Sequence, residues 1–159
     1  MRGVLLGSLM VSALVALPAA AQSIDKKAIG VADIKKMVAA AEAEAKKLNQ
    51  AVTIAIADES GTVIFLQKGD DAAAATIDIA QGKARTAARL RSPTKRLADA
   101  VAGGGGAGLL SIPGIVPLEG GLPVTADGKV IGAIAASGAP SGALDAQIAQ
   151  AGLDALAKK

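Results

Sequence analysis

The stretch that decides the fold spans residues 118–138 and reads LEGGLPVTADGKVIGAIAASG. Two β-prone runs, 122–125 and 130–136, flank the tetrapeptide ADGK. An Asp-Gly pair between apolar runs is a strong local signal for a tight hairpin turn, so we predict that this stretch is the central hairpin of the domain. We expect its glycines to lie where a Cβ would be unwelcome, because φ is positive or another group approaches the backbone; they are Gly120, Gly121, Gly132 and Gly138.

The composition limits the chemistry that is available. The chain has 159 residues, of which 52% are hydrophobic, and Phe65 is its one aromatic residue. It contains no Cys, His, Tyr or Trp. Zinc sites, disulfides, Fe–S clusters, thiol nucleophiles and His-dependent triads are therefore excluded, and we predict no metal site. Because single-stranded nucleic acid is usually bound by stacking on aromatic side chains, we also predict no nucleic-acid partner, despite a pI near 9.3.

Residues 1–21 have the pattern of a secretory signal peptide. Arg2 gives a positive start, an apolar run follows at 4–17, and Ala19 and Ala21 occupy the small-residue positions of a cleavage site. The apolar run is shorter than the roughly 20 residues that a spanning helix needs. We therefore expect cleavage after Ala21, a periplasmic or secreted location, no stable membrane insertion of the cleaved protein, and a single domain at 22–159.

The periodicity of the remaining chain predicts the order of its elements. Apolar residues at helical spacing alternate with β-branched runs and with turn residues. The predicted elements are helices at 31–48, 72–90, 94–102 and about 143–157, hairpin strands at 51–58 and 62–68, a loop of four glycines at 103–106, a short edge strand at 115–116, and the hairpin described above. Ser92 and Ser141 are candidate helix caps. The fold class is therefore α+β, with a mostly antiparallel sheet of about five strands and helices packed on it.

Several motifs resemble those of the GlcG/HbpS family, which includes the C-terminal domain of PduO-type proteins. The most specific are Lys83-Ala84-Arg85-Thr86-Ala87 and the block that runs from Glu119-Gly120-Gly121 to Ser137-Gly138. The resemblance covers about 32–156. It implies a small domain with a central antiparallel sheet, similar to profilin-like folds, that commonly oligomerises. Characterised members bind haem, some degrade it, and some act as extracellular sensor partners.

The chain departs from the family where haem is concerned. With no His in the sequence, an axial His ligand is impossible. Met37, the remaining soft donor of the mature chain, lies on the predicted apolar face of the first helix. The resemblance therefore implies a haem or related tetrapyrrole held by apolar contacts and by pairing of its propionates with Lys83, Arg85 and Arg89. A solvated helix face explains these three cations equally well.

The central hairpin supplies the other candidate site residues. Glu119 is a candidate general base or ligand-binding group, or it hydrogen-bonds its own loop. Backbone N–H groups near Gly120, Gly121 and Gly138 are candidates for stabilising negative charge. Ser137 and Ser141 are candidates for an anion-binding nest, although capping alone explains Ser141.

Three functions remain open from the sequence. The first is an exported protein of the GlcG/HbpS type that binds a small organic ligand, with haem as a candidate cofactor and a homo-oligomer as the expected assembly. The alternative is an enzyme that acts on a small metabolite, with Glu119 as the general base. The third is a structural oligomer with no ligand.

Overall fold

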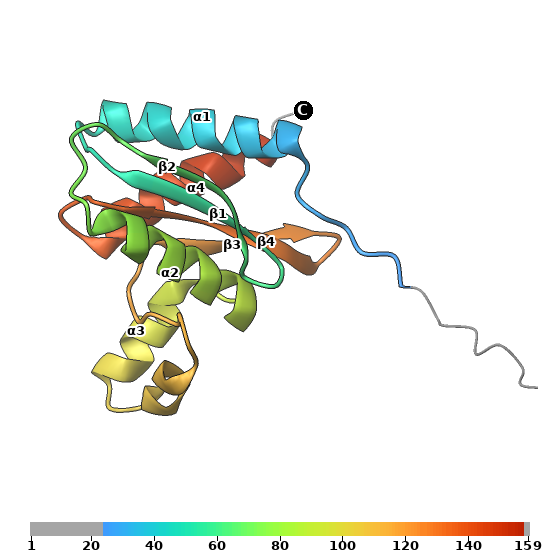
Figure 1. The fold of residues 1–159 in the computed structure, drawn as a ribbon, viewed down its shortest axis with the longest axis vertical. Coiled ribbons are helices and arrows are strands. Elements are labelled where there is room, and N and C mark those ends of the chain that lie inside the picture. The colour runs from blue at the N-terminus through green and yellow to red at the C-terminus, as the bar shows by residue number, and fades with distance from the viewer. Residues whose placement is uncertain (1–23, 158–159) are drawn as a thin grey trace, which may run out of the picture.

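The computed structural model describes residues 24–157. Within that range the elements follow the predicted order closely (Figure 1). They are α1 (Val31–Lys47), β1 (Thr53–Asp58), β2 (Val63–Lys68), α2 (Thr76–Leu90), α3 (Thr94–Ala102), a 3-10 helix η1 (Ala107–Ser111), β3 (Gly121–Ala126), β4 (Lys129–Ser137) and α4 (Gly142–Ala157). The predicted signal peptide lies outside the described residues.

The strands form one antiparallel sheet in the order β2-β1-β4-β3. The α+β class and the antiparallel sheet are confirmed. The decisive hairpin is β3–β4, in which β4 is an inner strand and β3 an edge strand. Its turn has the geometry that Asp-Gly favours, with φ of 49° at Asp127 and 72° at Gly128.

The predicted edge strand at 115–116 is wrong, so the described sheet has four strands. Ile115 is buried, but the N–H of Val116 donates to Thr86 Oγ1 of α2 at 2.8 Å instead of entering a ladder. The flanking residues Pro113 and Pro117 have no N–H to give to a neighbouring strand. The segment is therefore attached to a helix and not to the sheet.

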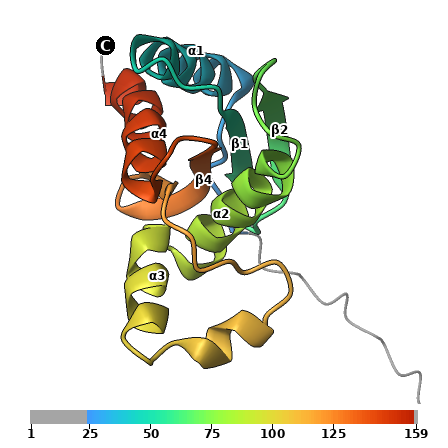
Figure 2. The ribbon, with the colours of Figure 1, turned by 90° about the vertical axis from the view of Figure 1, so that its left-hand side faces the viewer.

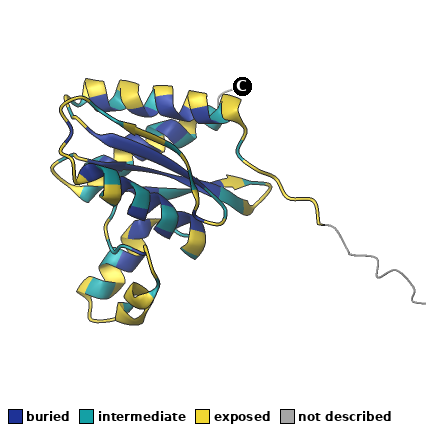
Figure 3. Ribbon diagram, in the orientation of Figure 1, coloured by how far each residue is buried: buried dark blue, intermediate teal, exposed yellow. Residues whose placement is uncertain are grey.

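Two cores lie on opposite faces of the sheet (Figure 3). The core under α1 and α4 contains the larger side chains, among them Met37, Ile56, Ile134 and Ile148, all with no exposed surface. The core under α2 consists entirely of alanines: 55, 57, 80, 84, 87, 88, 133 and 135. Successive residues of a strand point to opposite faces, so Ile and Ala alternate along β1, and in β4 Ile134 and Ala136 face the first core whereas Ala133 and Ala135 face the second. The core under α2 contains no aromatic side chain, and its small residues let the helix pack closely on the sheet.

Helix α3 and η1 extend away from the sheet as a separate arm (Figure 2). The predicted bounds of α3 are confirmed, but Ser92 does not cap it, because the N-cap residue is Pro93 and no side chain bonds to the cap. Helix α2 begins at Thr76 and not at residue 72, after turns that span 70–75. The four glycines do form a loop, and the sequence analysis missed the 3-10 helix that follows it.

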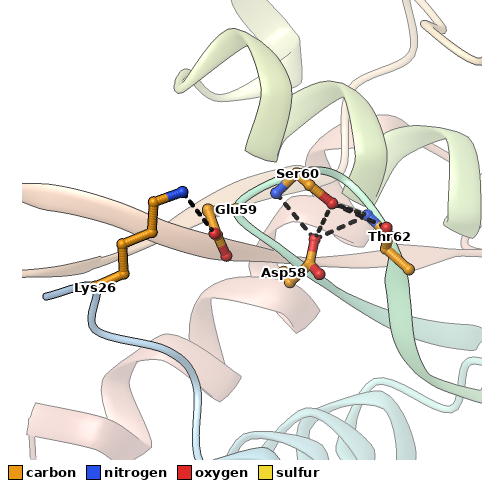
Figure 4. A network of polar contacts seen from close by, with 5 residues as sticks. All are labelled: Lys26, Asp58, Glu59, Ser60 and Thr62. Carbon is orange, nitrogen blue, oxygen red and sulfur yellow. Dashed lines mark hydrogen bonds and ion pairs between the residues drawn. The ribbon is translucent and has the colours of Figure 1, made fainter. Parts of the chain in front are cut away.

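The turn between β1 and β2 is organised by one carboxylate (Figure 4). Asp58 Oδ1 accepts hydrogen bonds from the N–H groups of Ser60 and Thr62, both at 2.9 Å, and from the Ser60 hydroxyl at 2.6 Å. Burial opposes ionisation of Asp58, but these hydrogen bonds outweigh it and lower the pKa of the carboxyl. The neighbouring Glu59 pairs with Lys26 at 3.5 Å.

Candidate functional site

A cleft of about 460 Å³ lies where α2, the segment before β3, and the β4–α4 loop meet. We call it the Lys83–Asp145 cleft. Its lining residues are Thr76, Ile79, Lys83, Ala98, Asp145, residues 117–119 and residues 137–142. Four of the predicted site residues, Lys83, Glu119, Ser137 and Gly138, therefore come together here from three parts of the chain.

The buried end of the cleft contains an ion pair. Lys83 Nζ donates to Asp145 Oδ2 at 2.6 Å and to the carbonyl of Ala136 at 3.1 Å. The two side chains are 4% and 5% exposed. Asp145 Oδ1 accepts from the N–H of Ala139 at 3.0 Å. The pair thus links α2, the end of β4 and the start of α4, and Lys83 is not on a solvated helix face.

The environment of Asp145 has opposing effects on its ionisation. Burial raises the pKa of its carboxyl, because a charged group loses its hydration in the interior. The hydrogen bond and charge of Lys83 lower it, and burial prevails. Asp145 is thus a buried carboxyl that loses hydration on ionising and that accepts two hydrogen bonds, from Lys83 and from the N–H of Ala139.

Ser137 is a buried residue whose hydroxyl forms no hydrogen bond with the described residues. The residue is 3% exposed. Every fully enclosed side-chain nitrogen or oxygen among the described residues does have a partner. The Ser137 hydroxyl therefore opens into the cleft that the residue lines.

Glu119 is half-buried at the rim of the cleft. Its carboxylate makes no hydrogen bond or ion pair with the described residues, so the loop contact suggested by the sequence does not form. Its Cβ and carbonyl lie against Gly142, where an added Cβ would be 2.7 Å from the Glu119 Cβ. No hydrogen bond or ion pair links the Glu119 carboxylate to a second titratable side chain of the described residues, and its role as a general base stays a prediction.

Three of the predicted site glycines are required by packing. A Cβ on Gly120, whose φ is +127°, would lie 2.8 Å from both Lys83 Nζ and the Asp145 Cβ. A Cβ on Gly121 would lie 2.6 Å from the carbonyl of Lys83. A Cβ on Gly138, whose φ is +136°, would lie 2.5 Å from the carbonyl of Ala51. These close approaches explain the glycines without a ligand, and their predicted binding roles stay predictions.

The N-terminus of α4 forms another wall of the cleft. Ser141 caps it, since its Oγ accepts from the N–H of Leu144 at 3.3 Å, which confirms the predicted cap. The first N–H groups of a helix have no partner inside the helix. Gly142, the first residue of α4, lines the cleft, so the positive end of the helix dipole lies at this wall.

The other two predicted cations lie elsewhere. Arg85 packs over Gly61 and Gly114, and Arg89 donates to the carbonyl of Pro113 at 3.2 Å. Neither lines the Lys83–Asp145 cleft. The structure therefore separates them from Lys83, although the three residues are close in sequence.

Three further features of the described residues bear on function. A larger cleft of about 750 Å³ lies between the end of α1 and the 69–71 turn and is lined mainly by polar residues. Residues 24–157 contain no cluster of three or more side chains suited to a metal ion. None of their helices is long and apolar enough to span a bilayer.

The sequence analysis overlooked Asp145 as a site residue, although a signal was present. Asp145 occupies the same helical stripe as Ile148, Ala149 and Gly152, all of them buried. Lys83 lies likewise among the buried alanines of α2. One acid and one base, each on an otherwise apolar stripe, form a pattern that favours a buried pair.

Comparison with known proteins identifies the family. A family model described as haem degrading protein HbpS-like matches residues 29–154. The chain belongs to the HbpS-like family. It is 44% identical to Protein GlcG of Escherichia coli K12 over 101 residues, which are 64% of this chain and 75% of GlcG. The predicted GlcG/HbpS resemblance is thereby confirmed.

Solved structures of HbpS-like proteins have the same fold. A double mutant of HbpS from Streptomyces reticuli superposes with a TM-score of 0.79 at 36% identity, over 89% of this chain and 97% of the other. A complex of PduOC with haem superposes with a TM-score of 0.76 at 31% identity, over 81% of this chain and 95% of the other.

Proposed function

We propose that this HbpS-like protein binds a small organic ligand in the Lys83–Asp145 cleft. The observation that carries the proposal is the hydroxyl of Ser137, which opens into the cleft, forms no hydrogen bond with the described residues and can therefore bond to a ligand. A cleft of about 460 Å³ is within the range of small-molecule sites. The Lys83–Asp145 ion pair at the buried end of the cleft links three of the segments that line it.

The haem form of this proposal draws support from the haem complex of the similar PduOC. The donor set of this chain does not fit an ordinary haem centre. The sequence has no His, Cys or Tyr, Met37 is fully buried in the core, and Lys83 is already paired. Arg85 and Arg89, the predicted propionate partners, lie outside the cleft. Haem would therefore have to be held by apolar contacts and surface cations without an axial side chain.

Titration of the purified protein with haemin tests the haem form directly. Saturable binding with a shifted Soret band, reduced by Arg85→Gln and Arg89→Gln, would support it. A Soret band identical to that of free haemin at every ratio would remove haem from the proposal and leave the small-ligand form standing.

The small-ligand form has its own test. Amide signals of Ser137, Gly138 and Gly142 in nuclear magnetic resonance spectra should shift on addition of the true ligand from a metabolite library. Ser137→Ala should weaken that binding, whereas Ser111→Ala, outside the cleft, should not. If no library compound shifts the cleft amides, the proposal is wrong.

We also propose export and self-association. The signal-peptide pattern of residues 1–21 supports export, and mass spectrometry of the protein from the periplasm or medium should give a chain that begins at residue 22. The family resemblance supports a homo-oligomer, and light scattering of the purified chain measures the assembly.

A further inference from the structure

Strand β2 is a free edge of the sheet. It pairs with β1 alone, so the backbone N–H and C=O groups on its other side have no strand partner among the described residues (Figure 2). Ile64 and Leu66 of this strand are 42% and 40% exposed. Leu66 lies opposite Ala55, which belongs to the core under α2, so the two side chains are on the α2 face of the edge. Proteins normally cover or break up an edge strand that carries exposed apolar side chains.

The opposite edge of the sheet is protected in this way. Strand β3 contains Pro123, which has no N–H to offer to a further strand. The N–H of Gly121, at the start of the same strand, donates to Thr94 Oγ1 of α3 at 3.0 Å. The sheet is therefore more readily extended at β2 than at β3.

Helix α2 runs antiparallel to β2 along this edge. Thr76, at the start of α2, bonds to Thr53 of β1 at 2.7 Å, and Thr53 lies opposite Lys68 at the end of β2. Arg89, in the last turn of α2, packs over Gly61, just before β2 begins. The first turn of the helix is therefore near the end of β2, and its last turn is near the start of β2.

Basic side chains gather at the start of β2. Arg85 and Arg89 pack over the β1–β2 turn and form no ion pair with the described residues. The two acids of the turn are engaged locally, Asp58 by hydrogen bonds within the turn and Glu59 by Lys26 at 3.5 Å. The start of the edge thus has two arginines with no acidic partner in the described part of the chain.

Acidic side chains gather at the end of β2. Asp70 and Asp71 follow the strand, and Asp78 lies in the first turn of α2. All three are exposed and form no ion pair with the described residues. Lys68, the last residue of β2, donates to the carbonyls of Gly69 and Asp70 at 2.9 and 3.1 Å. Because three carboxylates outnumber this ammonium, the end of the edge is negative.

From the apolar centre and the oppositely charged ends, we infer that β2 binds β2 of a second copy of this chain, antiparallel across a two-fold axis. In the register that places Ile64 opposite Leu66 of the second copy, the turn before β2 lies opposite the turn that follows β2 in the other copy, and Arg89 of each copy faces Asp70 of the other. Both apolar side chains are then covered and unlike charges meet, whereas a parallel pairing would bring like charges together. The inference rests on the self-association proposed above and names its surface, and ligand binding in the cleft does not depend on it.

Sedimentation equilibrium of the purified chain measures its mass and the dissociation constant of the dimer. Leu66→Arg places a charge at the centre of the interface and should weaken association at least about 100-fold. Leu110→Arg is the matched control, because Leu110 lies on η1 at 39% exposure and its replacement should leave association unchanged. Far-UV circular dichroism checks that both variants are folded. An assembly that Leu66→Arg leaves unchanged would overturn the inference alone, whereas a chain that is monomeric at every concentration would overturn the proposed self-association as well.

A charge exchange tests the antiparallel orientation without a change in apolar packing. Arg89→Glu and Asp70→Arg should each weaken association at least about tenfold at low ionic strength, because each places like charges opposite one another. Combining both changes in one chain, or mixing the two single variants, should restore the dissociation constant to within about threefold of wild type, because unlike charges again meet between the copies. Arg96→Glu, at an exposed arginine of α3, is the control and should have no effect. Weak association that persists in the mixture would overturn the inference.

Discussion

The buried ion pair between Lys83 and Asp145 makes a quantitative prediction about stability. Asp145→Asn removes the negative charge but keeps an oxygen that can accept from the N–H of Ala139. It leaves the Lys83 ammonium, 4% exposed, without a counter-charge. Breaking a buried pair in this way costs about 3–5 kcal/mol. A domain of this size has a free energy of unfolding of only about 5–15 kcal/mol, so the variant should lose a large part of its stability.

Urea unfolding followed by far-UV circular dichroism measures this loss, because the chain has no Trp or Tyr for fluorescence. Asp99→Asn is the matched control, since the Lys95–Asp99 pair is exposed and should contribute nothing measurable. The double variant Lys83→Met with Asp145→Leu should recover most of the loss, since a well-packed apolar pair can replace a buried ion pair. A loss below about 1 kcal/mol in Asp145→Asn, or additive losses in the double variant, would refute the reasoning.

Three further predictions concern single residues. Gly120→Ala should destabilise strongly because of its positive φ and the 2.8 Å approach of Lys83, whereas Gly108→Ala, with open space around it, should be tolerated; thermal melting compares them. Ser137→Ala should leave the free energy of unfolding unchanged, because its hydroxyl bonds to no described residue, and a loss in urea unfolding would reveal a missed partner. The lowered pKa of Asp58 means that its stabilising effect is present above about pH 4 and is lost as pH falls through the folded-state pKa. The stability difference between wild type and Asp58→Asn should therefore vanish in acid, and a difference that persists at pH 2 would contradict this assignment.

The hairpins and helices could be predicted because their signals are local. The Asp127-Gly128 turn, the alternation of Ile and Ala in β1 and the cap at Ser141 each depend on a few neighbouring residues. The prediction of a strand at 115–116 was wrong because a short apolar run does not show whether its backbone bonds to a strand or to a helix. Only the fold brings Thr86 to the N–H of Val116.

Part of the candidate site could be predicted because its sequence signal is also local. Glu119, Ser137 and Gly138 were found from a glycine-rich motif, but their convergence with Lys83 depends on α2 crossing the sheet near the end of β4. Asp145 lies 62 residues from Lys83 in sequence. Pairings at such separation are set by topology, so the sequence could indicate that two buried charges existed but not that they meet.

The alanine core beneath α2 has an entropic consequence. Alanine has no side-chain rotamers to lose on folding, whereas Leu or Ile loses about 0.5–1 kcal/mol each. The eight alanines of this layer thus bury less apolar surface than larger residues would, but they fix α2 on the sheet at no rotameric cost. Lys83 lies on this same helix, so its ammonium is positioned in the cleft by a helix–sheet contact that orders no side-chain rotamers.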